Sequence, residues 1–318
     1  MDQIYTDLKK FGRVKLNEPL ARHTTFKIGG PARYFVVVGE TEKLAGLLNY
    51  LNAGGHEYFV LGGGSNILAG DSAYDGVAVN IATDKQPEVE LSESGGAIEA
   101  EAGVLLGAIV NLAVKNGLGG LEWAIGIPGT VGGAVRGNAG AVGKDTGHIV
   151  ESVLVWRGGE ILELKKNECG FGYRESAFKR NKDVVLRARF ALTRGDKQQI
   201  ITQMQNNAKQ RSGWIVPYPS AGSFFKNMKL ADWTGRAEDL PELFRQRGTL
   251  PAGWLIEQIG GRGKSVGGAK IMERHGNFLI NYDNATQSDV LRLVDELKES
   301  VYNKFGIELV PEVEILKY

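Results

Sequence analysis

The chain has little of what disulfides, metal centres and membrane spans require. Cys169 is its only cysteine, so an intramolecular disulfide is excluded and a reducing compartment fits. The four histidines (His23, His56, His148 and His275) are scattered without metal-ligand spacing, so we expect no metal site. No apolar run approaches the roughly 18 residues that indicate a transmembrane helix, and the N-terminus lacks the apolar core of a signal peptide. We therefore expect a cytoplasmic protein with no membrane partner.

An excess of charge of either sign is also missing. The 38 Lys and Arg residues nearly balance the 37 Asp and Glu residues, which leaves a net charge of +1. This balance gives no support to a nucleic-acid partner. Apolar residues make up 42% of the chain and charged residues 24%, which is ordinary for a globular protein. The length of 318 residues suffices for two or three domains.

Glycine, in contrast, is abundant. The chain has 44 glycines, about twice the average usage, and ten of them lie within the 27 residues 117–143. Glycine can adopt a positive φ and lets a backbone approach a bulky ligand closely. Tight turns alone would need fewer glycines than this segment contains. The segment favours a surface of backbone N–H groups that holds a phosphate or a flat cofactor ring.

A second glycine cluster follows a predicted strand, Tyr58–Leu61. Several amides in one turn after a strand can bind a pyrophosphate without a cationic side chain. Two such loops, about fifty residues apart, predict one elongated cofactor that carries phosphate. The residues of this second loop are Gly62, Gly63, Gly64, Ser65, Asn66 and Ile67.

Neither cluster fits the two common nucleotide motifs. Gly263-Lys264-Ser265 supplies the end of a P-loop, but the first glycine of that motif would fall at Gln258. The G-x-G-x-x-G spacing of a Rossmann fold is absent from both clusters. The cofactor is therefore held by another fold.

Hydrophobic periodicity predicts a mixture of strands and helices, and thus an α+β fold. Thr41 is expected to cap a helix that Gly54 and Gly55 end, and a Thr286-x-x-Asp289 capping box is expected to begin a helix that ends at Gly306. Residues 157–160, Arg-Gly-Gly-Glu, predict a hairpin turn. The expected helices are 44–52, 105–115, 198–209, 252–259 and 286–306, and the expected strands are 33–38, 58–61, 76–81, 96–102, 149–157, 160–164, 184–192 and 307–316.

Eight motifs occur in a fixed order along nearly the whole chain. They are TTFKIGGPA (24–32), LGGGSNIL (61–68), GIPGTVGGAVRGNAGA (126–141), FGYRESAFK (171–179), PSAGSFFKN (219–227), AGWLIEQIG (252–260), GGAKIMERHGNFLIN (267–281) and LVPEVEI (309–315). In these motifs the chain resembles the UDP-N-acetylenolpyruvoylglucosamine reductases, also called UDP-N-acetylmuramate dehydrogenases.

The resemblance implies an α+β fold with a two-part FAD-binding region of the vanillyl-alcohol-oxidase type and a smaller α+β substrate-binding domain. The expected regions are residues 1–82 and 83–209 for FAD binding and 210–318 for substrate binding. Some relatives carry an insertion that places a Tyr over the substrate. Only about thirty residues join Phe190 to Ser223 here, so we expect the shorter subtype without that insertion.

The resemblance also implies the reaction. Hydride passes from NADPH to FAD and then to the enolpyruvyl ether of UDP-N-acetylglucosamine, and a protein group protonates the neighbouring carbon to give UDP-N-acetylmuramate. This step belongs to peptidoglycan synthesis, and so to cell-wall biogenesis, cell shape and cell division. We expect a monomer whose partners are the UDP-sugar substrate and NADPH.

Three residues match the catalytic positions of the family. Arg174 would stabilise the carboxylate-bearing enolate, because a guanidinium fork suits a carboxylate. Ser223 would donate the proton, with Ser220 as the neighbouring hydroxyl. Glu312 would orient or polarise the enolpyruvyl group, and Glu314 lies two residues further on the same expected strand. Spacing alone does not separate these neighbours, and only the motifs select Ser223 and Glu312.

The remaining matched positions bind cofactor or substrate. The substrate is expected to contact Tyr173, Arg211, Asn227 and Gln258. FAD is expected on the loop of residues 62–67 and on Gly126, Ile127, Pro128, Gly129, Thr130, Gly132, Gly133, Asn138 and Gly140.

Two other functions remain open from the residues. One is an FAD-dependent oxidase or dehydrogenase of the same fold that acts on an alcohol, which would need a base where this chain offers an acid. The other is a non-catalytic UDP-sugar-binding relative, which would be expected to lack the Ser or the Arg of the catalytic set.

Overall fold

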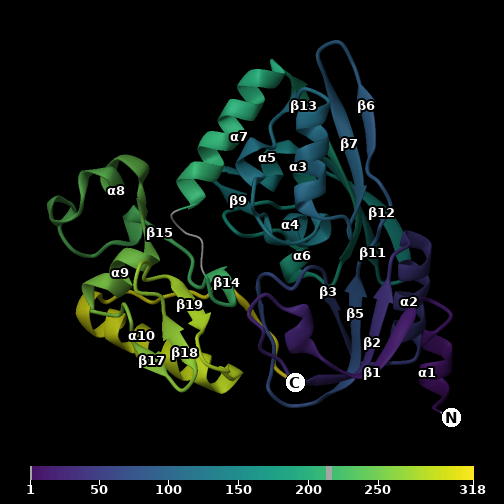
Figure 1. The fold of residues 1–318 in the computed structure, drawn as a ribbon, viewed down its shortest axis with the longest axis horizontal. Coiled ribbons are helices and arrows are strands. Elements are labelled where there is room, and N and C mark those ends of the chain that lie inside the picture. The colour runs from purple at the N-terminus through teal and green to yellow at the C-terminus, as the bar shows by residue number, and fades with distance from the viewer. Residues whose placement is uncertain (1, 213–216) are drawn as a thin grey trace. The chain divides into compact units, whose positions relative to one another are not determined.

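The computed structural model describes residues 2–212 and 217–318. They group into two compact units (Figure 1). Unit 1 holds the described residues of Met1–Glu18, Ala32–Gly63 and Asp75–Ile215, and unit 2 those of Pro19–Pro31, Gly64–Tyr74 and Val216–Tyr318. Two short segments of the N-terminal third thus belong with the C-terminal third. The division into three consecutive regions stays a prediction.

The first sheet of unit 1 has the strand order β1 (Arg13–Pro19), β2 (Pro31–Val38), β5 (Tyr74–Ile81) and β3 (Tyr58–Leu61). Strands β3 and β5 are parallel. Helix α2 (Thr41–Ala53) packs on it, because its leucines recur every three or four residues on one face. The short helix α1 (Gln3–Leu8) precedes β1.

The predicted cap of α2 is wrong. Glu40 is the N-cap residue, and Thr41 is the first residue of the helix, where its buried hydroxyl has no hydrogen-bond partner. The predicted end is confirmed: Gly54 is the C-cap, and Gly55 has a φ of 62°.

The second sheet of unit 1 is antiparallel. Its order is β12 (Glu160–Lys165), β11 (Val150–Arg157), β13 (Val184–Arg194), β7 (Gly95–Glu101) and β6 (Glu88–Leu91), and β8 (Leu118–Gly119) also pairs with β13. The predicted hairpin is confirmed, since Arg157 pairs with Glu160 and both glycines between them have positive φ.

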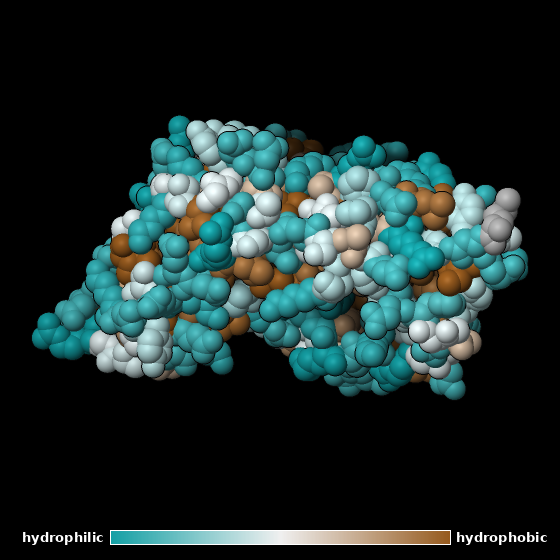
Figure 2. All heavy atoms as spheres, turned by 90° about the horizontal axis from the view of Figure 1, so that it is seen from below, coloured by the Kyte–Doolittle hydropathy of each residue, from teal (hydrophilic) through white to brown (hydrophobic). Residues whose placement is uncertain are grey.

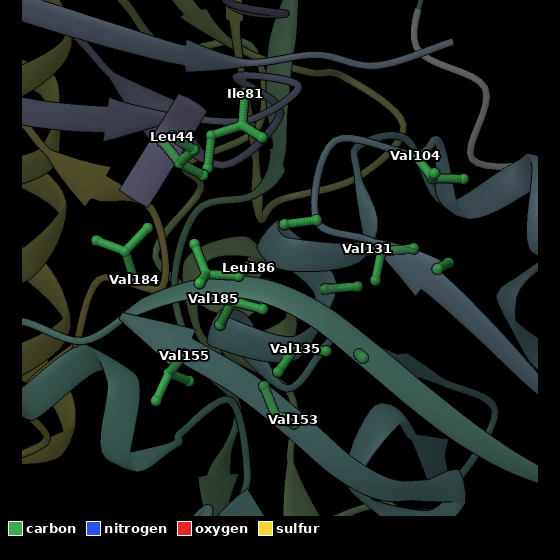
Figure 3. Close-up of a cluster of buried hydrophobic side chains, with 14 of the residues drawn as sticks. Leu44, Ile81, Val104, Val131, Val135, Val153, Val155, Val184, Val185 and Leu186 are labelled. Carbon is green, nitrogen blue, oxygen red and sulfur yellow. The ribbon is translucent and has the colours of Figure 1, made fainter. Parts of the chain in front are cut away.

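Helices α3 (Leu106–Lys115) and α4 (Val131–Gly137) pack on the second sheet (Figure 1). Figure 3 shows Val131 and Val135 of α4 among the sheet residues Val153 and Val185. This packing fixes the glycine-rich segment to a rigid layer. Unit 1 also contains β9 (Gly140–Ala141), β10 (Lys144–Asp145), α5 (Thr146–Ile149), α6 (Ala177–Arg180) and α7 (Lys197–Ser212).

Unit 2 is built on a four-stranded sheet with the order β14 (Ser220–Ser223), β19 (Phe278–Asn281), β18 (Ala269–Ile271) and β17 (Ser265–Val266). Buried residues of α9 (Ala252–Gln258) and α10 (Gln287–Phe305) form one core with this sheet. The other elements are the strand pair β15 (Met228–Lys229) and β16 (Thr249–Leu250), α8 (Glu242–Arg247), and β4 (Ile67–Leu68), which is parallel to β20 (Glu314–Ile315).

The predicted C-terminal strand, residues 307–316, is mostly not a strand. Only β20 is regular, because the segment changes partner along its length. Lys226 N–H donates to the carbonyl of Val310 (2.8 Å) and Glu312 N–H to that of Phe224 (2.7 Å), whereas Glu314 N–H donates to Asn66 (3.0 Å). Glu312 and Glu314 therefore do not lie on one regular strand.

The surface and the described helices add two observations. Figure 2 shows one face on which hydrophobic residues form small patches separated by hydrophilic ones. Within residues 2–212 and 217–318, no helix is long and apolar enough to cross a membrane. The same residues contain no cluster of side chains suited to a metal ion.

Helix α10 begins and ends as predicted. The Thr286 hydroxyl accepts from Asp289 N–H (3.0 Å), and the Asp289 carboxylate accepts from Thr286 N–H (3.1 Å). Asp71 adds a cap from a distant segment, since its carboxylate accepts from Gln287 N–H (2.6 Å) and Ser288 N–H. Gly306 ends the helix with a φ of 67°.

We predict that Asp289 makes stability depend on acid pH. The Thr286 N–H bond, with those from Gly268 N–H and Arg292, lowers the Asp289 pKa from 3.8 to about 2. The shift corresponds to about 2 kcal/mol, present above the unfolded-state pKa and lost as pH falls toward the folded-state value. In urea unfolding followed by circular dichroism, Asp289→Asn should lose about this much at neutral pH.

The exposed carboxylate of Asp295, on the same helix, provides the control as Asp295→Asn. The gap between wild type and Asp289→Asn should shrink between pH 4 and pH 2, and the small gap for Asp295→Asn should not. A gap for Asp289→Asn that stays constant over this range would contradict the assignment.

Candidate functional site

The two glycine loops touch each other within unit 1. A Cβ atom at Gly62 would lie 2.5 Å from the hydroxyl of Thr130, and one at Gly63 would lie 2.8 Å from the Cα of Gly129. Only glycine allows this backbone approach. Asn80 fixes the start of the 62–67 loop, because its side-chain amide donates to the carbonyls of Leu61 (3.1 Å) and Gly62 (2.9 Å).

In the other loop, residues 126–133, two glycine amides are bonded to neighbouring protein groups. Gly132 N–H donates to the carbonyl of Ala102 (2.9 Å), and Gly133 N–H donates to the hydroxyl of Thr130, the N-cap of α4 (3.4 Å). Gly132 and Gly133 thus allow close packing, and their amides are already bonded. There is space beside Gly126, where a Cβ would meet no atom within 4 Å, although the next amide, of Ile127, donates to the carbonyl of Ala124 (3.1 Å).

The rest of the first loop belongs to unit 2. Gly64 has a φ of 60°, and a Cβ there would collide with the carbonyl of His23. The Gly64 carbonyl accepts from Thr25 N–H (3.0 Å), and the buried hydroxyl of Thr25 has no hydrogen-bond partner. A buried donor without a partner is rare and costs free energy.

Asn66 connects the glycine loop to the C-terminal segment. Its side-chain amide donates to the carbonyl of Glu312 (3.1 Å), and its own carbonyl accepts from Glu314 N–H. Ile67 then pairs with Glu314 in the parallel β4–β20 pair. The loop expected to hold the cofactor and the segment that carries Glu312 are thus neighbours in unit 2.

Arg174 lies in a tight turn of unit 1. Gly172 and Glu175 exchange two backbone hydrogen bonds (2.9 and 3.1 Å), which leaves Tyr173 and Arg174 as the central residues. Arg174 has a φ of 53°, a left-handed conformation that is uncommon for residues other than glycine and costs about 1–2 kcal/mol. Such strain persists only where the surroundings fix it, and it clusters at functional sites.

Contacts with α4 and its neighbours fix this turn. Asn138, the C-cap of α4, is buried; its amide donates to the carbonyl of Gly172 (2.7 Å), and its oxygen accepts from Gly147 N–H (2.8 Å). The Ser176 hydroxyl donates to the carbonyl of Arg136 (2.6 Å). A Cβ at Gly140 would lie 3.0 Å from Nη1 of Arg174, so this glycine leaves room for the guanidinium.

Ser223 and Glu312 lie on adjacent segments of unit 2. Ser223 is the last residue of β14 and pairs with Phe278, and the next residue, Phe224, accepts from Glu312 N–H (2.7 Å). Between Ser220 and Ser223 the pairing contains a bulge in which Gly222 has a φ of 80°. Bulges of this kind re-aim side chains next to active sites.

The neighbouring hydroxyl is used locally. Ser220 Oγ accepts from Gly222 N–H (3.4 Å), and Ser220 pairs with Ile280 inside the sheet. Ser223 Oγ makes no hydrogen bond within the described part of the chain. This difference supports Ser223 over Ser220 as the proton donor.

The predicted substrate residues lie in several places. Tyr173 is half exposed, and the Arg174 guanidinium lies 5.7 Å from the centre of the Tyr173 ring. In unit 2, the Asn227 oxygen accepts from Ala252 N–H (3.2 Å) at the start of α9, and Gln258 is exposed at the end of that helix. The side chain of Arg211 lies outside the described residues.

Sequence reasoning missed three polar residues around these loops. Thr25 lies in the motif TTFKIGGPA (24–32), which predicted no role for its individual residues, and Asn80 lies inside a strand. Asn277 is buried and bonds to the backbone beside Ser223. For Thr25 and Asn277, a polar residue within a motif was the available signal, but backbone partners cannot be read from a motif.

Comparison with known proteins identifies the family. An FAD binding domain family matches residues 32–165, and the C-terminal domain of UDP-N-acetylenolpyruvoylglucosamine reductase matches residues 210–316. The reductase named so from Carboxydothermus hydrogenoformans is 40% identical over 94% of this chain and 93% of its own. The reductase of the same name from Caldanaerobacter subterraneus is 40% identical, and the match covers 98% of this chain and 96% of its own. The chain belongs to the UDP-N-acetylenolpyruvoylglucosamine reductase family.

A crystal structure of a family member supports the fold. The UDP-N-acetylenolpyruvylglucosamine reductase from Thermus caldophilus superposes with a TM-score of 0.74 at 32% identity, and the match covers 96% of this chain and 98% of that one. The α+β fold with an FAD-binding region and a reductase-type C-terminal domain is therefore confirmed.

We predict that the contact between the two glycine loops is needed for FAD binding. Gly63→Ala would push the loops apart, because its Cβ would meet the Gly129 backbone, and Gly63 does not have a positive φ that would add strain. Overpacking of this kind costs about 1–3 kcal/mol, which corresponds to a loss of affinity of about 5- to 150-fold if the whole cost falls on the FAD complex. Titration of apoprotein with FAD, followed by fluorescence quenching, measures it.

Gly107→Ala is the matched control, because a Cβ at this helical glycine meets nothing within 4 Å. It should leave FAD affinity unchanged. Equal affinities for Gly63→Ala and Gly107→Ala would show that the loop contact does not serve the cofactor.

Proposed function

We propose that Arg174, Ser223 and Glu312 of this reductase carry out the reduction of UDP-N-acetylglucosamine enolpyruvate to UDP-N-acetylmuramate, a step of peptidoglycan synthesis. The activity itself follows from family membership at 40% identity over nearly the full chain. The roles of the individual residues are supported by their motifs and by the geometry of each unit.

The glycine loops suit FAD. The backbone contact between Gly63 and Gly129, which a Cβ would fill, and the space beside Gly126 fit a bulky ligand that carries phosphate. Residues 62–67 and 126–133 would hold the cofactor, together with Asn138 and Gly140. When bound, FAD would supply the redox chemistry, accepting hydride from NADPH and donating it to the β-carbon of the enolpyruvyl group.

Arg174 stabilises the negative charge that develops on the substrate. Addition of hydride to the β-carbon leaves electron density on the α-carbon and its carboxylate, so a cation that binds the enolate more tightly than the ground state lowers the barrier. The planar guanidinium can pair with both carboxylate oxygens. The strained turn keeps it in place without a change of conformation during the reaction.

Ser223 protonates the α-carbon. A serine hydroxyl is a weak acid, but a carbanion is a strong base, and proton transfer to it is favourable when nearby charges stabilise the alkoxide. The bulge before Ser223 and the hydrogen bonds of Phe224 set the direction of its side chain. Hydride at the β-carbon and the proton at the α-carbon together convert the C=C bond to CH–CH.

Glu312 orients the enolpyruvyl group. Its backbone is held on both sides, by its N–H to Phe224 and by its carbonyl from Asn66. A carboxyl group on so constrained a segment can hydrogen-bond to a substrate in one fixed direction. Glu314, in contrast, belongs to the β4–β20 pair.

The remaining polar residues would bind the UDP-sugar. Tyr173 lies next to Arg174, and Asn227 and Gln258 lie at the two ends of α9. Arg211 would join them, because the resemblance to the family implies a substrate contact at its position. A monomer in the cytoplasm is part of the proposal: a single cysteine and nucleotide-linked substrates suit a reducing compartment. Light scattering after size-exclusion chromatography tests the monomer.

One experiment separates this function from the alternatives. Under anaerobic conditions, NADPH should bleach the flavin absorbance, and UDP-N-acetylglucosamine enolpyruvate should then restore it. Bleaching without restoration would indicate a flavin reductase with another acceptor. Rapid turnover of an alcohol with oxygen would indicate an oxidase of the same fold, and the absence of any bleaching would indicate a non-catalytic binding protein.

We predict that Ser223→Ala affects only the second half of the reaction. Reduction of the flavin by NADPH should stay within about twofold of wild type, and reoxidation by the substrate should slow by about 100-fold or more, as expected for the loss of a general acid. Stopped-flow absorbance measures both rates. Ser220→Ala, which removes a hydroxyl that bonds within its own strand, should leave both rates near wild type. Equal loss of both half-reactions in Ser223→Ala would contradict the role.

A further inference from the structure

On one side of the segment that carries Ser223, a side chain provides hydrogen bonds that a neighbouring strand would otherwise provide. Residues 223–226 lie between β19 and the C-terminal segment. On the C-terminal side, the carbonyl of Phe224 and the N–H of Lys226 are bonded to Glu312 and Val310. On the β19 side, Phe224 N–H donates to the backbone carbonyl of Asn277 (2.8 Å).

Beyond that point β19 offers no further backbone. The strand begins at Phe278, and the chain before it turns away, with Gly276 N–H donating to the Glu257 carboxylate (3.2 Å) and Asn277 N–H to Nδ1 of His275 (3.2 Å). The N–H and carbonyl of Phe225 would therefore be left without strand partners. Phe225 is 1% exposed, so water does not replace them.

The side chain of Asn277 satisfies both groups. Its Oδ1 accepts from Phe225 N–H (2.9 Å), and its Nδ2 donates to the Phe225 carbonyl (2.8 Å). Asn277 is 2% exposed, and both bonds are buried. A side-chain amide is suited to this position because it carries a donor and an acceptor as a peptide group does.

We infer that Asn277 is a positioning residue for the proton donor, which fixes the backbone two residues after Ser223 and thereby the direction of the Ser223 hydroxyl. The inference rests on the proposed role of Ser223. Ser223 pairs with Phe278 directly after the irregular backbone at Gly222, and the bonds from Asn277 extend this fixed stretch of backbone to Phe225. Asn277 itself contacts backbone groups and does not act on the substrate.

The test compares Asn277→Leu, which keeps the branched shape but is larger and removes both bonds, with Asn277→Ser, whose smaller side chain leaves room for water. We expect reoxidation of the flavin by UDP-N-acetylglucosamine enolpyruvate to slow by about 10- to 100-fold in either variant, because displacement of a catalytic group by about 1 Å has effects of this size. Flavin reduction by NADPH should stay within about twofold of wild type. Retained FAD content and circular dichroism identify the variants that are folded.

Val301→Ala is the matched control for lost stability. Val301 is fully buried in α10 of the same unit and does not contact the Ser223 segment through any hydrogen bond described above. Its half-reactions should both stay near wild type. If Val301→Ala slows reoxidation as much as Asn277→Ser does, the effect of Asn277 is one of general stability and the inference is wrong.

A double-mutant cycle provides the readout that a purely structural role would not change. If Asn277 acts through the Ser223 hydroxyl, Asn277→Ser should slow reoxidation by less than about twofold once Ser223 is alanine, because interacting residues are not additive. Full additivity would overturn the inference. If Ser223→Ala alone leaves reoxidation unchanged, the proposed role of Ser223 fails; if it slows reoxidation and Asn277→Ser does not, only the role of Asn277 fails.

Discussion

The hydrogen bonds of the C-terminal segment hold the candidate site of unit 2 together. Residues 310–316 bond on one side to Phe224 and Lys226 and then, within a few residues, to Asn66 and Leu68. Three stretches of chain that are far apart in the sequence thus meet at Glu312. Because each bond joins two backbones or an amide and a backbone, the arrangement depends little on the identity of neighbouring side chains. It does depend on the segment being free to change partner, which a regular strand would not allow.

The many glycines of the two loops suggest flexibility, but in this structure they allow close backbone packing. Gly62 and Gly63 are needed because Thr130 and Gly129 lie against them, and Gly132 is needed because it packs on Ala102. The loops are therefore rigid, closely packed backbone. A rigid loop binds a large cofactor with a smaller loss of conformational entropy than a mobile one, which offsets the cost of ordering glycine during folding.

Local patterns in the sequence predicted most elements, because each depended on neighbouring residues. The β3 strand, the 157–160 hairpin and both ends of α10 follow from periodicity and turn chemistry, and they were predicted nearly to the residue. The errors arose where distant partners decide. Thr41 does not cap α2, and the expected strand 307–316 is divided between two partners. Motifs named the candidate residues but contained no signal for Asp71, which caps α10 from more than two hundred residues away.

The same limit explains why buried asparagines were the hardest residues to interpret. Asn138 links Gly147 to the turn of Arg174, and Asn277 completes the backbone beside Ser223, so each unit uses a buried amide next to a candidate catalytic residue. A charged side chain in either place would need a buried counter-ion and would alter the electrostatic potential in which an enolate is stabilised. A hydroxyl places its donor and its acceptor on one oxygen, whereas an amide places them on two atoms that can reach two separate backbone groups. A neutral amide supplies one donor and one acceptor, and it fixes a strained turn or an interrupted strand without adding charge to the site.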